Sequence, residues 1–199
     1  DSSDVMEALD GLGRLVARSL VVLDRAGPTR YGMLETIRQY ANAKLVASGE
    51  AEAARGRHLA HYWALAAQAE SALQGPDMVA WLQRLDPEAE NLRAALGWAF
   101  QERAEAAIDM SLAMRSYWRL RSVGSEGLER LDQAVDLARS LLPAEGSPRA
   151  LERSIVLART LATAAQAHAL WADAIVAREW ADEALAIARR TGDERALSL

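Results

Sequence analysis

Apolar and polar residues follow two different patterns along the chain, and the pattern changes near residue 48. Gly27 and Pro28 mark a turn between two short apolar runs, and Gly49 ends the helix that follows them. Over residues 1–48 the pattern predicts a helix from Val5 onward, strands at 19–23 and 30–34 joined by a turn at 24–29, and a helix at 35–47. Helix, hairpin and helix in this order form the back half of a winged-helix domain.

From residue 50 onward every periodic segment predicts a helix, and no strand signal occurs. Asp86, as an N-cap, and Pro87, as the first helical residue, are expected to open one of these helices. The expected helices cover 51–73, 77–85, 86–101, 104–121, 125–142, 149–170 and 172–190. Residues 143–148 form a Pro/Gly-rich connector.

Two of these helices, 125–142 and 172–190, repeat a pattern of small residues that begins at Gly127 and Ala177. Small residues at this spacing make a narrow helix face, as in the second helix of a tetratricopeptide-like pair. The expected fold is therefore all-α: a tetratricopeptide-like helical-repeat array at 49–199, preceded by a partial winged helix with one short β-hairpin at 1–48.

Composition excludes several classes of protein. The 199 residues include no cysteine, so disulfides, thiol nucleophiles and thiolate metal sites are excluded. No apolar run reaches the length of a membrane-spanning helix, and no signal peptide is visible, so we expect a cytoplasmic protein that does not bind membranes. The net charge of −5 gives no support to bulk nucleic-acid binding.

Three stretches together resemble a known family. They are LVARSLVVLDRAGPTRYGMLETIRQYANAKLVASGE at 15–50, WLQRLDPEAENLRAALGWAF at 81–100, and the helical tail. They resemble the STAND-class bacterial signalling ATPases, whose members often include LuxR-type or antibiotic-regulator-type DNA-binding domains. The resemblance implies a nucleotide-binding module, then a winged helix, then helical repeats. Because the sequence starts without methionine and ends within a helical pattern, we expect a fragment that begins in the winged helix.

The resemblance implies ATP or ADP as a cofactor of the parent protein, but the residues present do not form a nucleotide site. Relatives with a Met-His-Asp motif place its histidine near the ADP phosphates. The aligned residues here are Met33, Leu34 and Glu35, and leucine cannot donate a hydrogen bond to phosphate. The Walker A loop is also absent. We therefore expect no cofactor in this chain, and any ATPase activity would lie in a part of the protein that this chain lacks.

Other candidate chemical sites have ordinary structural explanations. The segment 10–14 (DGLGR) lacks the third glycine and the preceding strand of a dinucleotide loop. His58 and His61 share one helix face but have no third metal ligand nearby in sequence. Adjacent carboxylates such as Asp182 and Glu183 diverge on a helix. With no catalytic or metal constellation, the sequence predicts a chain that is not an enzyme.

Three groups of residues are candidates for binding. Arginines around the predicted hairpin could contact DNA: Arg14, Arg18, Arg25 and Arg30. Nearby acids reduce their net charge. A second group mixes arginines with aromatic residues, as binding hot spots do: Arg115, Tyr117, Trp118, Arg119, Arg121 and Arg130. The alternative is that Trp118 is buried and the arginines point outward. A third group forms an apolar stripe that could mediate self-association: Val176, Trp180 and Ile187.

These observations predict a non-catalytic sensor or scaffold arm of a multidomain STAND-type transcriptional regulator. The array would bind a protein partner or an inducer, and the winged helix would relay that event to an upstream nucleotide-binding module of the same protein. Two alternatives remain open. One is a DNA-binding winged-helix module, and the other is a structural arm that forms homo-oligomers.

Overall fold

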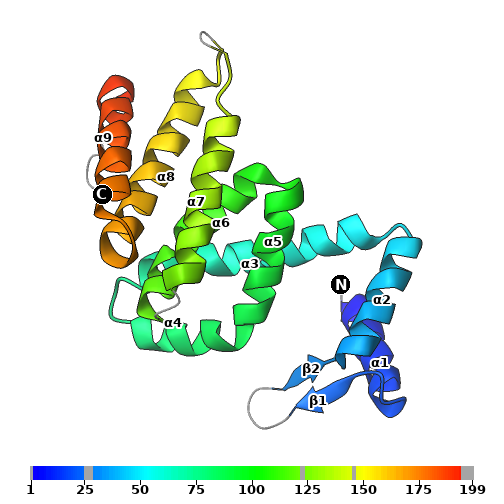
Figure 1. Cartoon of the computed structure of the whole chain (residues 1–199). Helices are drawn as coiled ribbons and strands as arrows, with labels where there is room; N and C mark the ends of the chain where they lie inside the picture. Colours follow the sequence, from blue (N-terminus) through cyan, green and yellow to red (C-terminus); the bar gives the residue numbers. More distant parts are fainter. Residues whose placement is uncertain (1, 25–28, 122–123, 145–146, 194–199) are drawn as a thin grey trace. The chain divides into compact units, whose positions relative to one another are not determined.

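The computed structural model describes residues 2–24, 29–121, 124–144 and 147–193 (Figure 1). In these ranges the chain is mostly helical and contains one two-stranded antiparallel sheet. Internal contacts divide the chain into two compact units, Asp1–Arg55 and Gly56–Leu199. We call them unit 1 and unit 2 and describe each by itself. No helix within the described ranges has both the length and the apolar character needed to span a membrane.

Unit 1 has the expected order of helix, hairpin and helix. Its elements are α1 (Ser2–Ala17), β1 (Val22–Asp24), β2 (Arg30–Gly32), α2 (Glu35–Ala47) and the first residues of α3 (Ala51–Ala72). In the hairpin, Leu23 pairs with Tyr31. The expected turn at 24–29 falls mostly on residues 25–28, which lie outside the described residues.

The first strand begins later than the predicted 19–23. Ser19 has a φ of 58°, which is left-handed, and the backbone N–H of Leu20 donates to the carbonyl oxygen of Leu15 at 3.0 Å. This pattern closes the carboxyl end of a helix. Residues 18–21 therefore terminate α1 instead of forming a strand, and the apolar run SLVVL alone could not show this.

Unit 1 leaves most of its large apolar side chains exposed. Val21 is buried, whereas nine other large apolar residues are exposed: Met6, Leu9, Leu20, Val22, Tyr31, Met33, Leu34, Tyr40 and Val46. Leu34 is the residue that precedes α2, and its side chain makes no capping hydrogen bond because it has no acceptor. Unit 1 therefore exposes more than half of the large apolar side chains whose burial is described.

Unit 2 consists of helices, as predicted. After α3 come α4 (Met78–Leu85), a 3₁₀ turn η1 (Asp86–Glu88), α5 (Ala89–Glu102), α6 (Ala104–Leu120), α7 (Gly124–Ser140), α8 (Ala150–Trp171) and α9 (Ala174–Thr191). From α5 to α9 each helix packs on the next one along the chain, and α6 also contacts α8 (Figure 1). Packing between sequence neighbours is what stacked helical pairs would produce.

The prediction that Asp86 caps a helix is wrong. A 3₁₀ turn occupies residues 86–88, and α5 begins at Ala89 without a side-chain cap. The Asp86 carboxylate instead accepts hydrogen bonds from Nε of Arg121 at 2.6 Å and from the hydroxyl of Tyr117 at 3.3 Å. A guanidinium partner is a stronger donor than a backbone N–H, and it comes from a helix that is distant in sequence.

The core of unit 2 depends on small residues where helices approach closely. The predicted narrow face of α7 is buried, and its members are Gly127, Leu131, Ala134, Val135 and Ala138. A Cβ atom at position 127 would lie 2.8 Å from Cβ of Trp118, and one at position 124 would lie 2.9 Å from Cδ2 of Trp171. Two tryptophans thus occupy space that only glycine leaves free.

Candidate functional site

A cleft of about 400 Å³ opens on unit 2 between α6 and α8. Its lining residues come from the turn after α3, from α6, from α7 and from α8: Gln74, Arg115, Ser116, Arg119, Leu131, Thr163, Gln166, Ala167, Leu170 and Trp171. This volume lies within the range of small-molecule sites in proteins, although six of the ten lining residues are polar, which is a larger share than such sites usually have. We refer to it as the α6–α8 cleft.

Helical periodicity explains why these residues line one cleft. Three of them lie on α6 at positions i, i+1 and i+4, starting from Arg115. Five lie on α8 at positions i, i+3, i+4, i+7 and i+8, starting from Thr163. Each set forms one continuous stripe along its helix. The contact between α6 and α8 places both stripes at the same cleft.

The two arginines of the cleft differ in their partners. Arg115 donates from Nη1 to Oε1 of Glu70 at 2.7 Å and to the carbonyl oxygen of Leu112 at 3.1 Å. Arg119 is exposed, and no carboxylate in the described ranges pairs with it. No acidic side chain is among the residues that line the cleft. The cleft therefore has a positive lining in a chain whose net charge is −5.

The apolar end of the cleft is formed by Leu170 and Trp171 at the last turn of α8. Leu170 is 63% exposed, so most of its side chain is accessible at the cleft. Trp171 packs against the core of unit 2, with its indole lying over Gly124 at the first turn of α7. The cleft thus combines a positively charged side with an apolar side.

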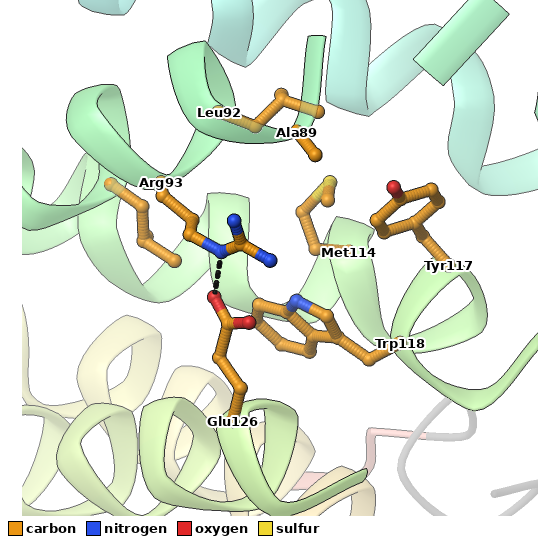
Figure 2. Close-up of a pocket in the computed structure, with 8 residues that line it drawn as sticks. Ala89, Leu92, Arg93, Met114, Tyr117, Trp118 and Glu126 are labelled. Carbon is orange, nitrogen blue, oxygen red and sulfur yellow. Dashed lines mark hydrogen bonds and ion pairs between the residues drawn. The ribbon is translucent and has the colours of Figure 1, made fainter. Parts of the chain in front are cut away.

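A second, much smaller pocket lies between α5 and α6 (Figure 2). Its volume of about 30 Å³ has room for only a few water molecules. Arg93 reaches across it from α5 and donates from Nε to Oε1 of Glu126 at 2.7 Å, and this hydrogen bond raises the pKa of Arg93. Tyr117 and Trp118 form its wall. We interpret this pocket as a packing crevice, because the ion pair already satisfies its charges.

The predicted surface of arginines and aromatic residues is divided by the structure. Arg115 and Arg119 line the α6–α8 cleft, whereas Tyr117 and Trp118 are buried in the core. Burial and the neighbouring Asp86 raise the pKa of Tyr117, so its hydroxyl stays protonated. The other two arginines have partners elsewhere: Arg121 pairs with Asp86, and Arg130 lies 5.7 Å from the ring centre of Phe100 and donates to Gln133. The structure thus has the features of the alternative given for this group, in which Trp118 is buried and the arginines lie outside the core.

The predicted self-association stripe is partly covered by its neighbours in unit 2. Ile187 is buried, and Trp180 meets the ring of His168 edge-on with centroids 5.0 Å apart. Val176 is half-buried. The stripe is therefore less exposed than expected, because His168 of α8 packs on Trp180, while Val176 and Trp180 both stay partly exposed. His168 itself is buried, and its Nε2 lies 2.9 Å from Oδ1 of Asp132.

The arginines proposed for DNA contact are distributed around unit 1. Arg14 and Arg18 are exposed at the end of α1, and Arg25 lies outside the described residues. Arg30 is directly opposite Asp24 in the hairpin, where opposite charges attract. Its charge is thus compensated within the hairpin, and a basic face on this hairpin is weaker than the arginine count indicates.

The histidine pair on α3 packs against a tyrosine of the same helix. In the described ranges, no group of three His, Cys, Asp or Glu side chains could hold a metal ion. The rings of His58 and His61 pack on Tyr62, with centroids at 4.6 Å and 4.9 Å. Burial lowers the pKa of His58, and a hydrogen bond to Asn91 opposes that shift. The two residues therefore have a packing role.

Sequence reasoning identified only two residues of the α6–α8 cleft as part of a site. The missed residues include Thr163 and Gln166, polar positions on the alanine-rich segment 162–167 (ATAAQA). Polar residues on one stripe of an otherwise apolar helix were the available signal. They could not be joined to Arg115 and Arg119 without knowledge of how α6 and α8 pack.

No family model matches the chain. No solved structure matches it either. Two proteins named "Putative HTH-type transcriptional regulator", from Mycobacterium bovis and from Mycobacterium tuberculosis, are each 35% identical to the chain over 199 residues. Each alignment covers 98% of this chain and 22% of the relative. The chain therefore spans about a fifth of the length of the curated relatives it matches, and it is similar to one segment of much longer proteins.

Proposed function

We propose that this chain is a non-catalytic sensing arm of an HTH-type transcriptional regulator. The α6–α8 cleft is the observation that supports a sensing role most directly, because it offers an uncompensated charge, neutral polar groups and an apolar wall together. Similarity to regulators of transcription over nearly the whole chain supports the link to gene control. We further propose a cytoplasmic location, since a regulator of this kind acts on the chromosome.

The finer proposal concerns how a binding event would reach the rest of a longer protein. We propose that unit 2 is a helical-repeat array, that unit 1 is the end of a winged helix, and that both belong to a STAND-type regulator. The exposed apolar side chains of unit 1, such as Leu9, Tyr31 and Tyr40, support contact with another module. That module is proposed to be an upstream nucleotide-binding domain that binds ATP or ADP. This chain itself is proposed to bind no cofactor.

A charge-neutralising substitution tests the sensing role. Arg119→Gln, introduced at the chromosomal locus, is expected to change the set of transcripts that the regulator controls. Arg190→Gln is a matched control, because Arg119 and Arg190 are both exposed and both lie in the last turn of their helices. Arg190 lies about 24 Å along α9 from the end of that helix nearest the cleft, at 1.5 Å per residue.

The proposed sensing role predicts altered transcripts in the Arg119→Gln strain and unchanged transcripts in the Arg190→Gln strain. Circular dichroism of both purified variants would establish that each retains its helical content. Identical transcript profiles in the two strains and the wild type, across growth conditions in which the wild-type profile changes, would refute the role of the cleft in sensing.

A further inference from the structure

We propose that the α6–α8 cleft binds a small organic carboxylate, with its anionic group at Arg119 and Arg115 and its apolar body against Leu170 and Trp171. This inference rests on the proposed sensing function and names the class of ligand that the site would recognise. It follows from three features of the cleft: its charge, its size and the order of its polar and apolar walls.

The charge of the cleft favours a monoanion. Two guanidinium groups line it, but Arg115 is already paired with Glu70, which leaves about one positive charge without compensation. Arg119 supplies that charge, and it can bind the two oxygens of a carboxylate side by side. A phosphate dianion would require a second uncompensated cation, which the lining does not provide.

Neutral polar groups would complete the recognition of the carboxylate end. Ser116 follows Arg115 directly on α6, and Thr163 and Gln166 lie on the facing stripe of α8. Gln74 uses its amide nitrogen to donate to the carbonyl oxygen of Glu70 at 3.3 Å, which fixes the side chain at the cleft. Hydroxyl and amide groups at these positions can share the hydrogen bonds of one carboxylate without adding charge.

The apolar wall favours an organic body over a bare inorganic ion. Leu170 exposes most of its side chain, and the indole of Trp171 is restrained because it packs against the core of unit 2 and over Gly124. A fixed aromatic ring is a preorganised surface for an apolar ligand, because little conformational freedom is lost on binding. The volume of about 400 Å³ suits a molecule of drug-like size or smaller. A folded protein partner would need a far larger contact area.

Phenylacetate is a suitable probe, and phenylacetamide is its neutral control. Both are titrated into the whole ¹⁵N-labelled chain, and the indole N–H signal of Trp171 is followed by NMR after assignment with Trp171→Phe. Phenylacetate is expected to shift that signal at millimolar concentration. Phenylacetamide is expected to bind about tenfold or more weakly, since it lacks the charge-assisted hydrogen bonds.

The arginine variants locate the anionic group. Arg119→Gln is expected to reduce phenylacetate affinity about tenfold or more, to the level of the amide, whereas Arg190→Gln leaves it unchanged. Inorganic phosphate is expected not to displace phenylacetate. Four results would each overturn the carboxylate assignment. They are equal binding of phenylacetate and phenylacetamide, equal effects of the two variants on affinity, displacement of phenylacetate by phosphate, and no shift of the Trp171 signal.

The outcomes separate this inference from the sensing proposal. If phenylacetate does not bind but Arg119→Gln changes transcription, the carboxylate assignment fails and the sensing role stands, with a protein segment as the ligand of the cleft. If phenylacetate binds as expected but no transcript responds to Arg119→Gln, the chain has the predicted site and the sensing proposal fails.

Discussion

Replacing Gly127 by alanine is expected to destabilise unit 2, whereas replacing Gly97 by alanine is expected to stabilise it. Both glycines lie within helices, so alanine gains about 0.8–1 kcal/mol of helix propensity at either position. At Gly97 no atom lies within 4 Å of the added Cβ, apart from its chain neighbours and the backbone of its own helix. At Gly127 the added Cβ would lie 2.8 Å from Cβ and 2.9 Å from Cγ of Trp118. These atoms are the root of a buried side chain and cannot move without shifting α6.

The expected magnitude follows from two opposing effects. Overpacking of a filled core costs about 1–3 kcal/mol, so Gly127→Ala should lose a net of roughly 0–2 kcal/mol of unfolding free energy after the propensity gain. Helix propensity cancels in the comparison of the two variants, which should therefore differ by about 1–3 kcal/mol. Urea unfolding monitored by circular dichroism at a common m-value measures this difference.

Two results would refute the reasoning. One is a pair of midpoints shifted in the same direction by the same amount, because the contact with Trp118 would then have no energetic effect. The other comes from the double variant Gly127→Ala with Trp118→Leu. The smaller side chain should relieve the contact, so the two substitutions should be non-additive in the direction of mutual compensation. Strict additivity would show that the two positions do not interact.

Three further predictions concern charge. Arg159→Gln should lower the unfolding free energy by roughly 1–3 kcal/mol in a urea titration, because it leaves the buried carboxylate of Asp193 without its guanidinium partner. Arg159 is partly exposed, so the loss should be smaller than for a fully buried ion pair. A variant as stable as the wild type would contradict this prediction. Burial lowers the pKa of His58 in the folded chain, so on acidification the unfolded chain protonates this histidine first, and stability should fall as the pH drops below about 6.5. His58→Gln should weaken this pH dependence. Identical pH profiles of the variant and the wild type would exclude the effect. Finally, fluorescence anisotropy with a labelled random DNA duplex should show no binding at low salt, whereas salt-sensitive binding that Arg14→Gln and Arg18→Gln abolish would favour the DNA-binding alternative.

Helix positions could be predicted from the sequence because each depends on local periodicity and on the glycine and proline residues that end helices. The helix predicted at 35–47 matches α2, and the left-handed φ of Gly49 follows its end. The fate of Asp86 could not be predicted, because a residue before proline fits an N-cap equally well whether or not Arg121 competes for its carboxylate. Periodicity also identified the apolar stripe with Trp180 but could not show that His168 of α8 packs on it.

The site was harder to predict than the fold because its residues come from helices that are distant in sequence. The presence of arginine and tryptophan on α6 does not by itself show whether their side chains share one surface. Their spacing decides the matter: Arg115 and Arg119 are four residues apart on the cleft stripe, while Tyr117 and Trp118 point toward the core. Only a pairing of α6 with α8 adds Thr163, and such pairings are not encoded in local patterns.

The two glycines at the start of α7 connect the packing of unit 2 with its cleft. Gly127 leaves room for Trp118, which is buried in the core, and Gly124 leaves room for Trp171, which lines the cleft. A single helical turn therefore positions both the core and the binding surface. If ligand binding moved the indole of Trp171, the first contact to respond would be the one with α7. Trp171 is therefore the residue that connects the wall of the cleft with the packing of α7.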